Sequence, residues 1–211
     1  MIAKSNLNAN GYQYNEYQIV LTPNDNICDN ILMLKKEFTE KYKTSETYLK
    51  PQMLLVNFIH FQMIEERIVN HLKNISKGYN TFQVKLKNYG SFPSHTIFIN
   101  VETKQQVQNL VTKLKCIQGL ITMDKENKPH YIDDFYLTIA RKLLPWQYEK
   151  AWLEYNHRHF TGSFVANGFV LLKRKVESSM NGFHPVGSYQ VAHRFEFMNS
   201  PVMTKQGELF T

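Results

Sequence analysis

The sequence is poor in the residues that bind metals or carry out redox chemistry. It has only two cysteines, Cys28 and Cys116, which lie far apart among 211 residues. Zinc sites and redox pairs need closely spaced cysteines, and no such spacing occurs. We therefore expect both cysteines to be reduced and to behave as small hydrophobic residues. The sequence predicts neither a metal site nor a cofactor.

Long apolar runs are also missing. No run approaches the roughly 20 residues that a membrane helix needs, and residues 1–18 are rich in Asn, Gln and Tyr without the apolar centre of a signal peptide. The 43% hydrophobic and 20% charged residues are ordinary for a globular protein with a substantial core. We expect a cytoplasmic protein without a membrane partner.

Acidic residues are outnumbered by basic ones. The 25 Lys and Arg residues against 18 Asp and Glu give a formal charge of +7 and an isoelectric point near 9.2. A positive potential raises the local concentration of anions such as phosphates. The basic residues are spread along the chain, so an ordinary solvated surface explains them equally well. The charge permits a nucleic-acid partner without requiring one.

Hydrophobic periodicity alternates between strand and helix along the chain. The expected strands and helices are, in order, a strand at 17–21, a helix at 27–38, a strand at 52–58, a helix at 64–75, strands at 82–86 and 97–101, a helix at 107–114, a strand at 135–140, a helix from 145, and strands at 163–172 and 189–197. The Gly- and Pro-containing segment 177–188 is expected to be a loop. This order predicts an α+β protein of two similar half-domains. We expect a flexible leader at 1–16, one bilobal domain at 17–198 and a polar tail at 199–211.

Two of the expected strands carry a related pattern. Residues 50–55 read Lys-Pro-Gln-Met-Leu-Leu and residues 136–141 read Tyr-Leu-Thr-Ile-Ala-Arg, with 136 − 52 = 84 residues between corresponding positions. These segments resemble the motifs of the 2H phosphoesterase superfamily, in particular of bacterial proteins similar to 2'-5' RNA ligase. Members have two copies of His-x-Thr/Ser on strands that face each other across a cleft. The turn at 89–93 and the strand at 169–173 also resemble family segments. The resemblance implies a two-lobed α+β fold with antiparallel sheets around a central cleft.

The residues that carry the family's chemistry are mostly replaced in this chain. In the family one histidine accepts a proton, the other donates one, and the two hydroxyls hold phosphate oxygens. Here Gln52 cannot transfer a proton, and Tyr136 has an unperturbed pKa near 10, which suits proton transfer poorly. Leu54 removes one hydroxyl, and Thr138 alone keeps the expected residue type. The resemblance therefore implies a degenerate site without a confident catalytic residue. Its candidate ligands for a nucleotide or an RNA terminal phosphate are Lys50, Gln52, Tyr136, Thr138 and Arg141.

Two other functions stay open from the sequence. One is an active phosphoesterase on 2',3'-cyclic phosphates, in which Tyr136 or a relocated histidine transfers the proton; His130 lies six residues before Tyr136 in an expected loop. His159 alone has Thr two positions later, but it lies at a helix end, and His95 is expected on a strand with a structural role. The other function is a protein-interaction scaffold that keeps only the fold.

Overall fold

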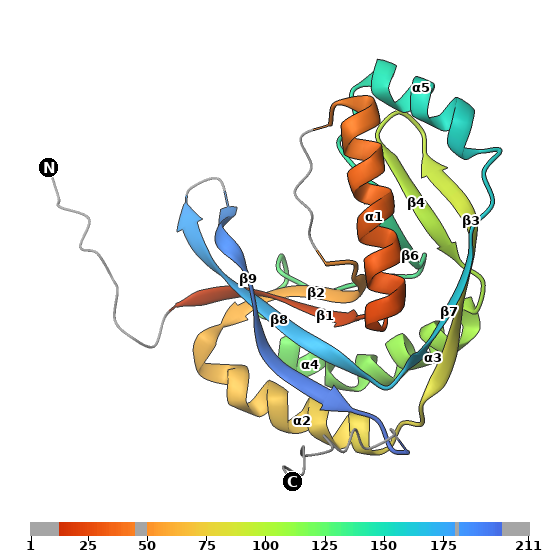
Figure 1. Ribbon diagram of the computed structural model, residues 1–211. Coiled ribbons are helices and arrows are strands. Elements are labelled where there is room, and N and C mark those ends of the chain that lie inside the picture. The colour runs from red at the N-terminus through yellow and green to blue at the C-terminus, as the bar shows by residue number, and fades with distance from the viewer. Residues whose placement is uncertain (1–12, 45–49, 180–181, 200–211) are drawn as a thin grey trace, which may run out of the picture.

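The strands form two antiparallel sheets in the computed structural model, which describes residues 13–44, 50–179 and 182–199 (Figure 1). The five-stranded sheet has the order β5-β2-β1-β8-β9. Its strands are β1 Tyr14–Leu21, β2 Met53–Phe61, β5 His130–Tyr131, β8 Gly168–Ser179 and β9 Gly182–Glu196. The four-stranded sheet has the order β6-β4-β3-β7. Its strands are β3 Phe82–Phe92, β4 Thr96–Val101, β6 Tyr136–Ala140 and β7 Thr161–Ala166. The α+β class with two antiparallel sheets is confirmed.

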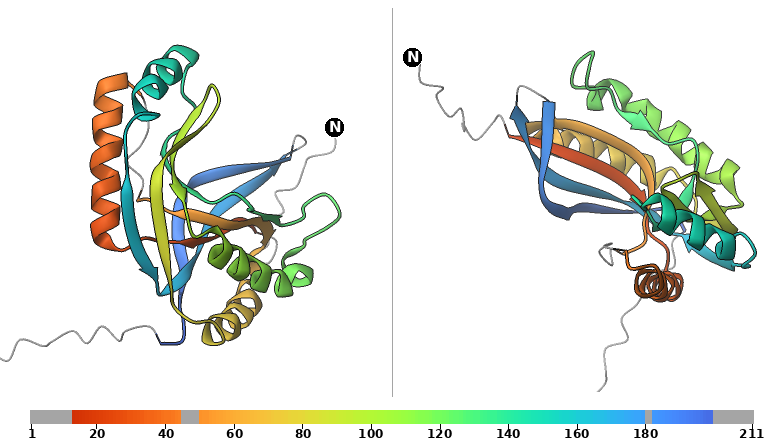
Figure 2. Two further views of the ribbon diagram at one scale, coloured as in Figure 1. Left: turned by 90° about the vertical axis from the view of Figure 1, so that its right-hand side faces the viewer. Right: turned by 90° about the horizontal axis from the view of Figure 1, so that it is seen from above.

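The first helix packs on the sheet formed by later strands. Helix α1 (Asp25–Tyr42) follows β1 of the five-stranded sheet but contacts β6 and β7 of the other sheet. Helix α5 (Pro145–Tyr155) contacts β4 of that same four-stranded sheet. Figure 2 shows α1 beside this four-stranded sheet, and the helix contacts both of its edge strands, β6 and β7. Helices α2 (Glu65–Lys77) and α4 (Gln118–Ile121) lie below the five-stranded sheet in Figure 1. Helix α3 (Lys104–Leu114) contacts α2 and β3, and 3₁₀ turns at Gln62–Ile64 and Lys115–Ile117 lead into α2 and α4.

Helix α1 begins and ends where local chemistry favours it. Asn24 Oδ1 accepts a hydrogen bond from the backbone N–H of Ile27 at 3.1 Å, which satisfies one of the free donors of the first turn. Ile27, Ile31 and Phe38 form its buried face. The helix ends at Lys43, whose φ of 53° is left-handed and cannot continue it.

Each sheet has one face covered by helices and one face without them, which we call the open face. In the four-stranded sheet Val84 and Leu86 are buried under the helices, while Lys85 and Lys87 alternate with them and are exposed. Successive residues of a strand point to opposite faces, so the open faces are defined by this alternation. The main core is one cluster that includes helix-facing residues of both sheets.

The C-terminal strands differ from the expectation. The single strand expected at 163–172 is two strands, β7 and β8, which belong to different sheets. The loop expected at 177–188 is largely part of the β8–β9 hairpin, although residues 180–181 lie outside the described part. Pro185 is tolerated because β9 is an edge strand. Strand β1 begins at Tyr14, so the last residues of the expected leader pair in the sheet.

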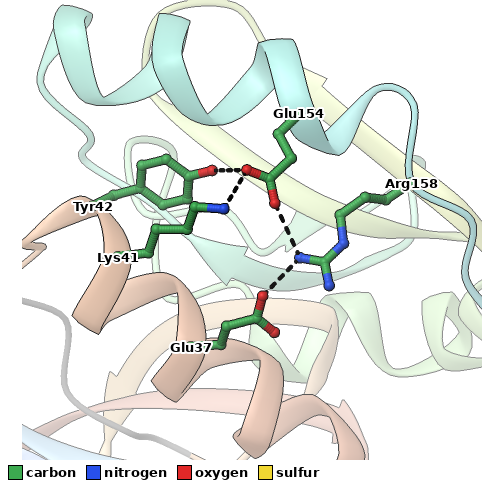
Figure 3. Close-up of polar contacts among 5 residues, drawn as sticks. All are labelled: Glu37, Lys41, Tyr42, Glu154 and Arg158. Atoms are coloured by element: carbon green, nitrogen blue, oxygen red, sulfur yellow. Dashed lines mark hydrogen bonds and ion pairs between the residues drawn. The ribbon is translucent and has the colours of Figure 1, made fainter.

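A polar cluster joins α1 to α5 (Figure 3). Lys41 Nζ lies 2.6 Å from Glu154 Oε2, and the Tyr42 hydroxyl donates to the same oxygen at 2.8 Å. Arg158 Nη1 lies 3.0 Å from Glu37 Oε1 and 3.6 Å from Glu154 Oε1. The hydrogen bonds from Lys41 and then Tyr42 lower the pKa of Glu154. Glu154 is therefore the centre of the α1–α5 contact.

Glu154→Gln is expected to lower the free energy of unfolding by about 0.5–1 kcal/mol at neutral pH, since the ion pairs are largely exposed. The pKa of Glu154 in the folded protein lies below its unfolded value of about 4.5. The contribution of Glu154 to the free energy of unfolding is therefore fully present above about pH 4.5 and is lost as the pH falls through the folded pKa. Urea denaturation from pH 7 to acid should show the two proteins converging. Glu149→Gln, on the same helix and exposed, is the control. A difference that persists unchanged in acid would contradict this role.

Candidate functional site

The first motif segment leads into β2. Lys50 is exposed and its amine lies 3.3 Å from Asp25 Oδ1, at the start of α1. Gln52 is exposed just before the strand, and Leu54 is half-buried within it. Lys50 and Gln52 are therefore accessible to a ligand, although the charge of Lys50 is partly compensated.

Leu54 belongs to an apolar cluster on the open face of the five-stranded sheet. It packs against Val20, Val170 and Leu172, together with Tyr189. A hydroxyl at this position would hold a phosphate oxygen in the family, but the leucine instead extends an apolar surface. At Leu54 the first motif segment thus contributes an apolar side chain to this packing.

An ion pair adjoins this cluster on β1 and β8. Arg174 Nε donates to Glu16 Oε2 at 2.5 Å, and the guanidinium lies 4.4 Å from the centroid of the Tyr189 ring. Burial is the main cause of the raised pKa of Tyr189, followed by the nearby Glu16 charge. Because Arg174 is already paired with a carboxylate and packed on a ring, its charge is largely compensated.

The second motif keeps a polar, partly accessible surface. In β6, Leu137 and Ile139 are buried under the helices, while Tyr136 and Thr138 are half-buried and alternate with them on the open face. Thr138 pairs in register with Phe98 of β4. The strand thus places a hydroxyl and a phenol two residues apart on one face.

Tyr136 lies in an aromatic cluster. Its ring centroid is 4.6 Å from that of Phe98 and 5.2 Å from that of Phe92. Gly90 makes room for this packing, because a Cβ there would lie 2.5 Å from Phe98 Cε2 and 2.7 Å from Asn100 Oδ1. The motif comparison did not reveal this cluster; the Gly-x-Phe turn at residues 90–92 was its only signal.

The environment of Tyr136 favours the protonated form of its phenol. Burial raises the pKa of the phenol most, the Asp134 charge raises it further, and Arg141 lowers it. At neutral pH the hydroxyl is therefore protonated and acts as a hydrogen-bond donor. A general base needs a pKa near the working pH, so this phenol is unsuited to that role.

The two motif segments occupy different sheets. Gln52 and Leu54 belong to the segment around β2, inside the five-stranded sheet, whereas Tyr136 and Thr138 lie on β6 at the edge of the four-stranded sheet. Arg141, exposed, directly follows β6. Tyr136 and Thr138 therefore lie together on β6 with Arg141 directly beyond its end, while Lys50 lies beside α1.

His130 lies with the first motif and not with the second. It belongs to β5 and pairs directly with Asn57 of β2. Directly paired residues project to the same face of a sheet, so His130 and Asn57 share a face of the five-stranded sheet. The expected loop around His130 is in part this short edge strand. The β2–β5 pairing therefore holds the backbone of His130 beside β2.

Two other histidines lie outside the strands and helices. His95 was expected on a strand, but it is exposed in the turn before β4, and its Nδ1 lies 2.6 Å from Thr96 Oγ1. Ser94 has a left-handed backbone, with φ of 71°, so the extended conformation of β4 begins only after it. His159 is exposed beyond α5, with Nδ1 3.4 Å from Asn88 Oδ1. Neither histidine occupies a motif position.

Within residues 13–44, 50–179 and 182–199, no group of three or more His, Cys, Asp or Glu residues could hold a metal ion. None of the helices in these ranges is both long and apolar enough to cross a membrane.

Comparisons with known proteins give one consistent picture. Crystal structures of Escherichia coli LigT with 3'-AMP and with NADP+ match with a TM-score of 0.56 at 10% and 12% identity. They cover 88% of this chain and 98% and 99% of LigT. A crystal structure titled as a phosphoesterase matches with a TM-score of 0.55 at 10% identity, over 86% of this chain and 98% of its own. These likenesses establish the fold. No curated protein sequence matches. A family model described as the 2'-5' RNA ligase superfamily matches residues 47–177, which is more than half of the chain, and the chain therefore belongs to that superfamily.

Proposed function

We propose that this chain binds a nucleotide or the terminal phosphate of an RNA at the second motif, without two-histidine catalysis. The observation that carries the proposal is the pair of Tyr136 and Thr138 on one open face, with Arg141 three residues after Thr138, just beyond the end of β6. Structures of Escherichia coli LigT contain 3'-AMP or ATP, which supports a nucleotide as the ligand class.

Each residue has a distinct role in this proposal. The Thr138 hydroxyl and the Tyr136 phenol donate hydrogen bonds to phosphate oxygens, and Arg141 supplies a charge-assisted bond that a planar guanidinium makes well. Lys50 and Gln52 contribute from the first segment, as a cation and a neutral donor. The three groups of the second motif can all donate hydrogen bonds and Arg141 is a cation, so this motif favours an anion.

Binding without efficient turnover follows from the replaced histidines. General acid–base catalysis contributes about 10²- to 10⁴-fold for each positioned group. Gln52 has no proton to exchange, and the pKa of Tyr136 is raised, mainly by burial. A ligand can thus be held without the proton transfers that would cleave it.

Thr138→Val is expected to weaken 3'-AMP binding about 10- to 100-fold, because a hydrogen bond to a charged group contributes about 1.5–3 kcal/mol. The side chains have nearly the same shape, so the fold should be retained. Isothermal titration calorimetry measures the affinity, and circular dichroism checks the fold. Thr112→Val, at an exposed position on α3, is the matched control. Unchanged affinity in Thr138→Val, or no binding by the natural chain, would refute the proposal.

A phosphoesterase that uses His130 is the second candidate. The position of His130 beside Asn57 places an imidazole on the sheet that carries the first motif. Hydrolysis of nucleoside 2',3'-cyclic phosphates well above background, lost in His130→Ala or Tyr136→Phe, would favour this candidate over simple binding.

A further inference from the structure

The open face of the four-stranded sheet continues well beyond the second motif. On β3 and β7 it forms an open groove of about 480 Å³. Residues with polar side chains dominate its lining, which consists of Gln83, Lys85, Leu86, Lys87, Glu102, Thr161, Gly162 and Ser163. We call the open-face donors Gln83, Lys85, Lys87, Thr161 and Ser163 the basic strip. The strip contains two cations, two hydroxyls and an amide.

The strip and the second motif lie on one continuous face. Tyr136 pairs with Asn100 of β4, and Glu102 follows two residues later on the same face. Glu102 Oε1 lies 3.1 Å from Lys87 Nζ on β3, and Lys87 pairs in turn with Thr161 of β7. The four strands β6, β4, β3 and β7 are separated by three spacings of about 4.8 Å each, so the open face is about 14 Å wide. The face therefore exceeds what a single phosphate group would occupy.

The charges of the strip suit an extended anion. Among the described residues no carboxylate pairs with Lys85, and the Lys87–Glu102 pair is about half exposed on both sides, so it is weak. A phosphate can replace Glu102 at little cost. Gln83 Nε2 and Ser163 Oγ, 3.4 Å apart, add neutral donors beside Lys85.

The end of the open face near β6 carries aromatic side chains. Phe92 and Tyr136 are half-buried, so each presents part of its ring to solvent, and Phe98 packs beneath them. Surfaces that bind single-stranded nucleic acid combine such rings, on which bases stack, with cations that follow the backbone. An acidic peptide would use the lysines but would gain nothing comparable from the rings.

We propose that the open face of the four-stranded sheet binds a single strand of RNA several nucleotides long, with its terminal nucleotide at Tyr136 and Phe92 and its following phosphates at Lys85 and Lys87. This inference rests on the proposed function at the second motif. It adds to that site a second, electrostatic binding region, the basic strip, which the motif residues do not include.

The test compares 3'-AMP with an oligoribonucleotide of about eight nucleotides, using fluorescence polarisation and competition. Lys85→Gln with Lys87→Gln is expected to weaken oligonucleotide binding about tenfold and to leave 3'-AMP affinity unchanged. Each single-strand phosphate contact contributes about 0.7 to the slope of log affinity against log salt, so the slope should fall by about 1.4. Lys73→Gln with Lys77→Gln, exposed positions on α2, removes the same charge elsewhere and should change neither value.

The outcomes separate the two proposals. If 3'-AMP binds and the oligonucleotide binds no tighter, RNA binding by the basic strip is refuted, while the proposed binding at the second motif is retained. The same conclusion follows if the α2 control variant loses as much oligonucleotide affinity as the strip variant. If the strip variant loses affinity while Thr138→Val changes nothing, the strip is supported and the motif site fails. If neither ligand binds, both proposals are overturned. An acidic peptide that competes as well as the oligonucleotide would overturn the RNA assignment.

Discussion

Restoring the family residues is expected to raise hydrolysis of nucleoside 2',3'-cyclic phosphates by at least about 10²-fold, and up to about 10⁴-fold for each proton-transfer step. The variant combines Gln52→His, Leu54→Thr and Tyr136→His. A histidine has a pKa near the working pH and can serve as acid or base, whereas an amide and a phenol with a raised pKa cannot. The assay is release of the nucleoside 2'- or 3'-phosphate, followed by chromatography.

Partial variants make this result interpretable. Either histidine alone leaves one proton transfer without a partner, so each single variant should gain much less than the triple variant. Thr138→Val in the triple background should lower the rate again, because it removes a phosphate contact. A folded triple variant that binds 3'-AMP but turns over no faster than the natural chain would show that the strands around Gln52 and Tyr136 do not present their side chains to one ligand.

Phe38→Ala should lower the free energy of unfolding by about 3–5 kcal/mol, a large fraction of the total stability of a typical domain. Phe38 is 1% exposed, and its ring centroid lies 4.7 Å from that of Tyr42 and 5.3 Å from that of Tyr155. The truncation leaves a cavity between α1 and α5, whose lining loses these contacts. Urea denaturation followed by circular dichroism gives the change.

Met33→Ala is the control for that measurement. Met33 lies on the same helix and is 71% exposed, so its truncation should change stability by at most about 0.5 kcal/mol. Equal losses in the two variants would mean that α1 does not pack through Phe38. Because α1 contacts β6, Phe38→Ala should also weaken nucleotide binding at temperatures where the helix loosens.

Helices and strands could be predicted from the sequence where buried residues recur with a regular spacing. The strand around Thr138 could be predicted because Leu137 and Ile139 alternate with polar neighbours, and α1 because Ile27, Ile31 and Phe38 recur on one helical face. The motif frames then placed these elements in the correct fold. Propensity, pattern and resemblance all agreed at these positions.

Sequence reasoning failed where neighbours decide the conformation. The first part of β9, before the strand expected at 189–197, is mostly exposed and contains Gly187 and Pro185, so its sequence resembles a loop. Pairing with β8 makes it a strand. Gly168 permits that pairing, because a Cβ there would lie 1.9 Å from the backbone oxygen of Phe195. The contact between Lys87 and Glu102 likewise depends on strand pairing that no local pattern encodes. Long-range contacts of this kind need the tertiary structure.

The position of β1 at the centre of the five-stranded sheet constrains how the protein can be made. Tyr14–Leu21 pairs on one side with β2 and on the other with Gly168–Ser179, so its second neighbour is synthesised more than a hundred residues later. Contacts between such distant segments slow folding. One edge of β1 also stays unpaired until the ribosome has synthesised β8. We expect nascent chains that stop before β8 to depend on chaperones, and cutting the gene into two half-proteins to yield neither half folded.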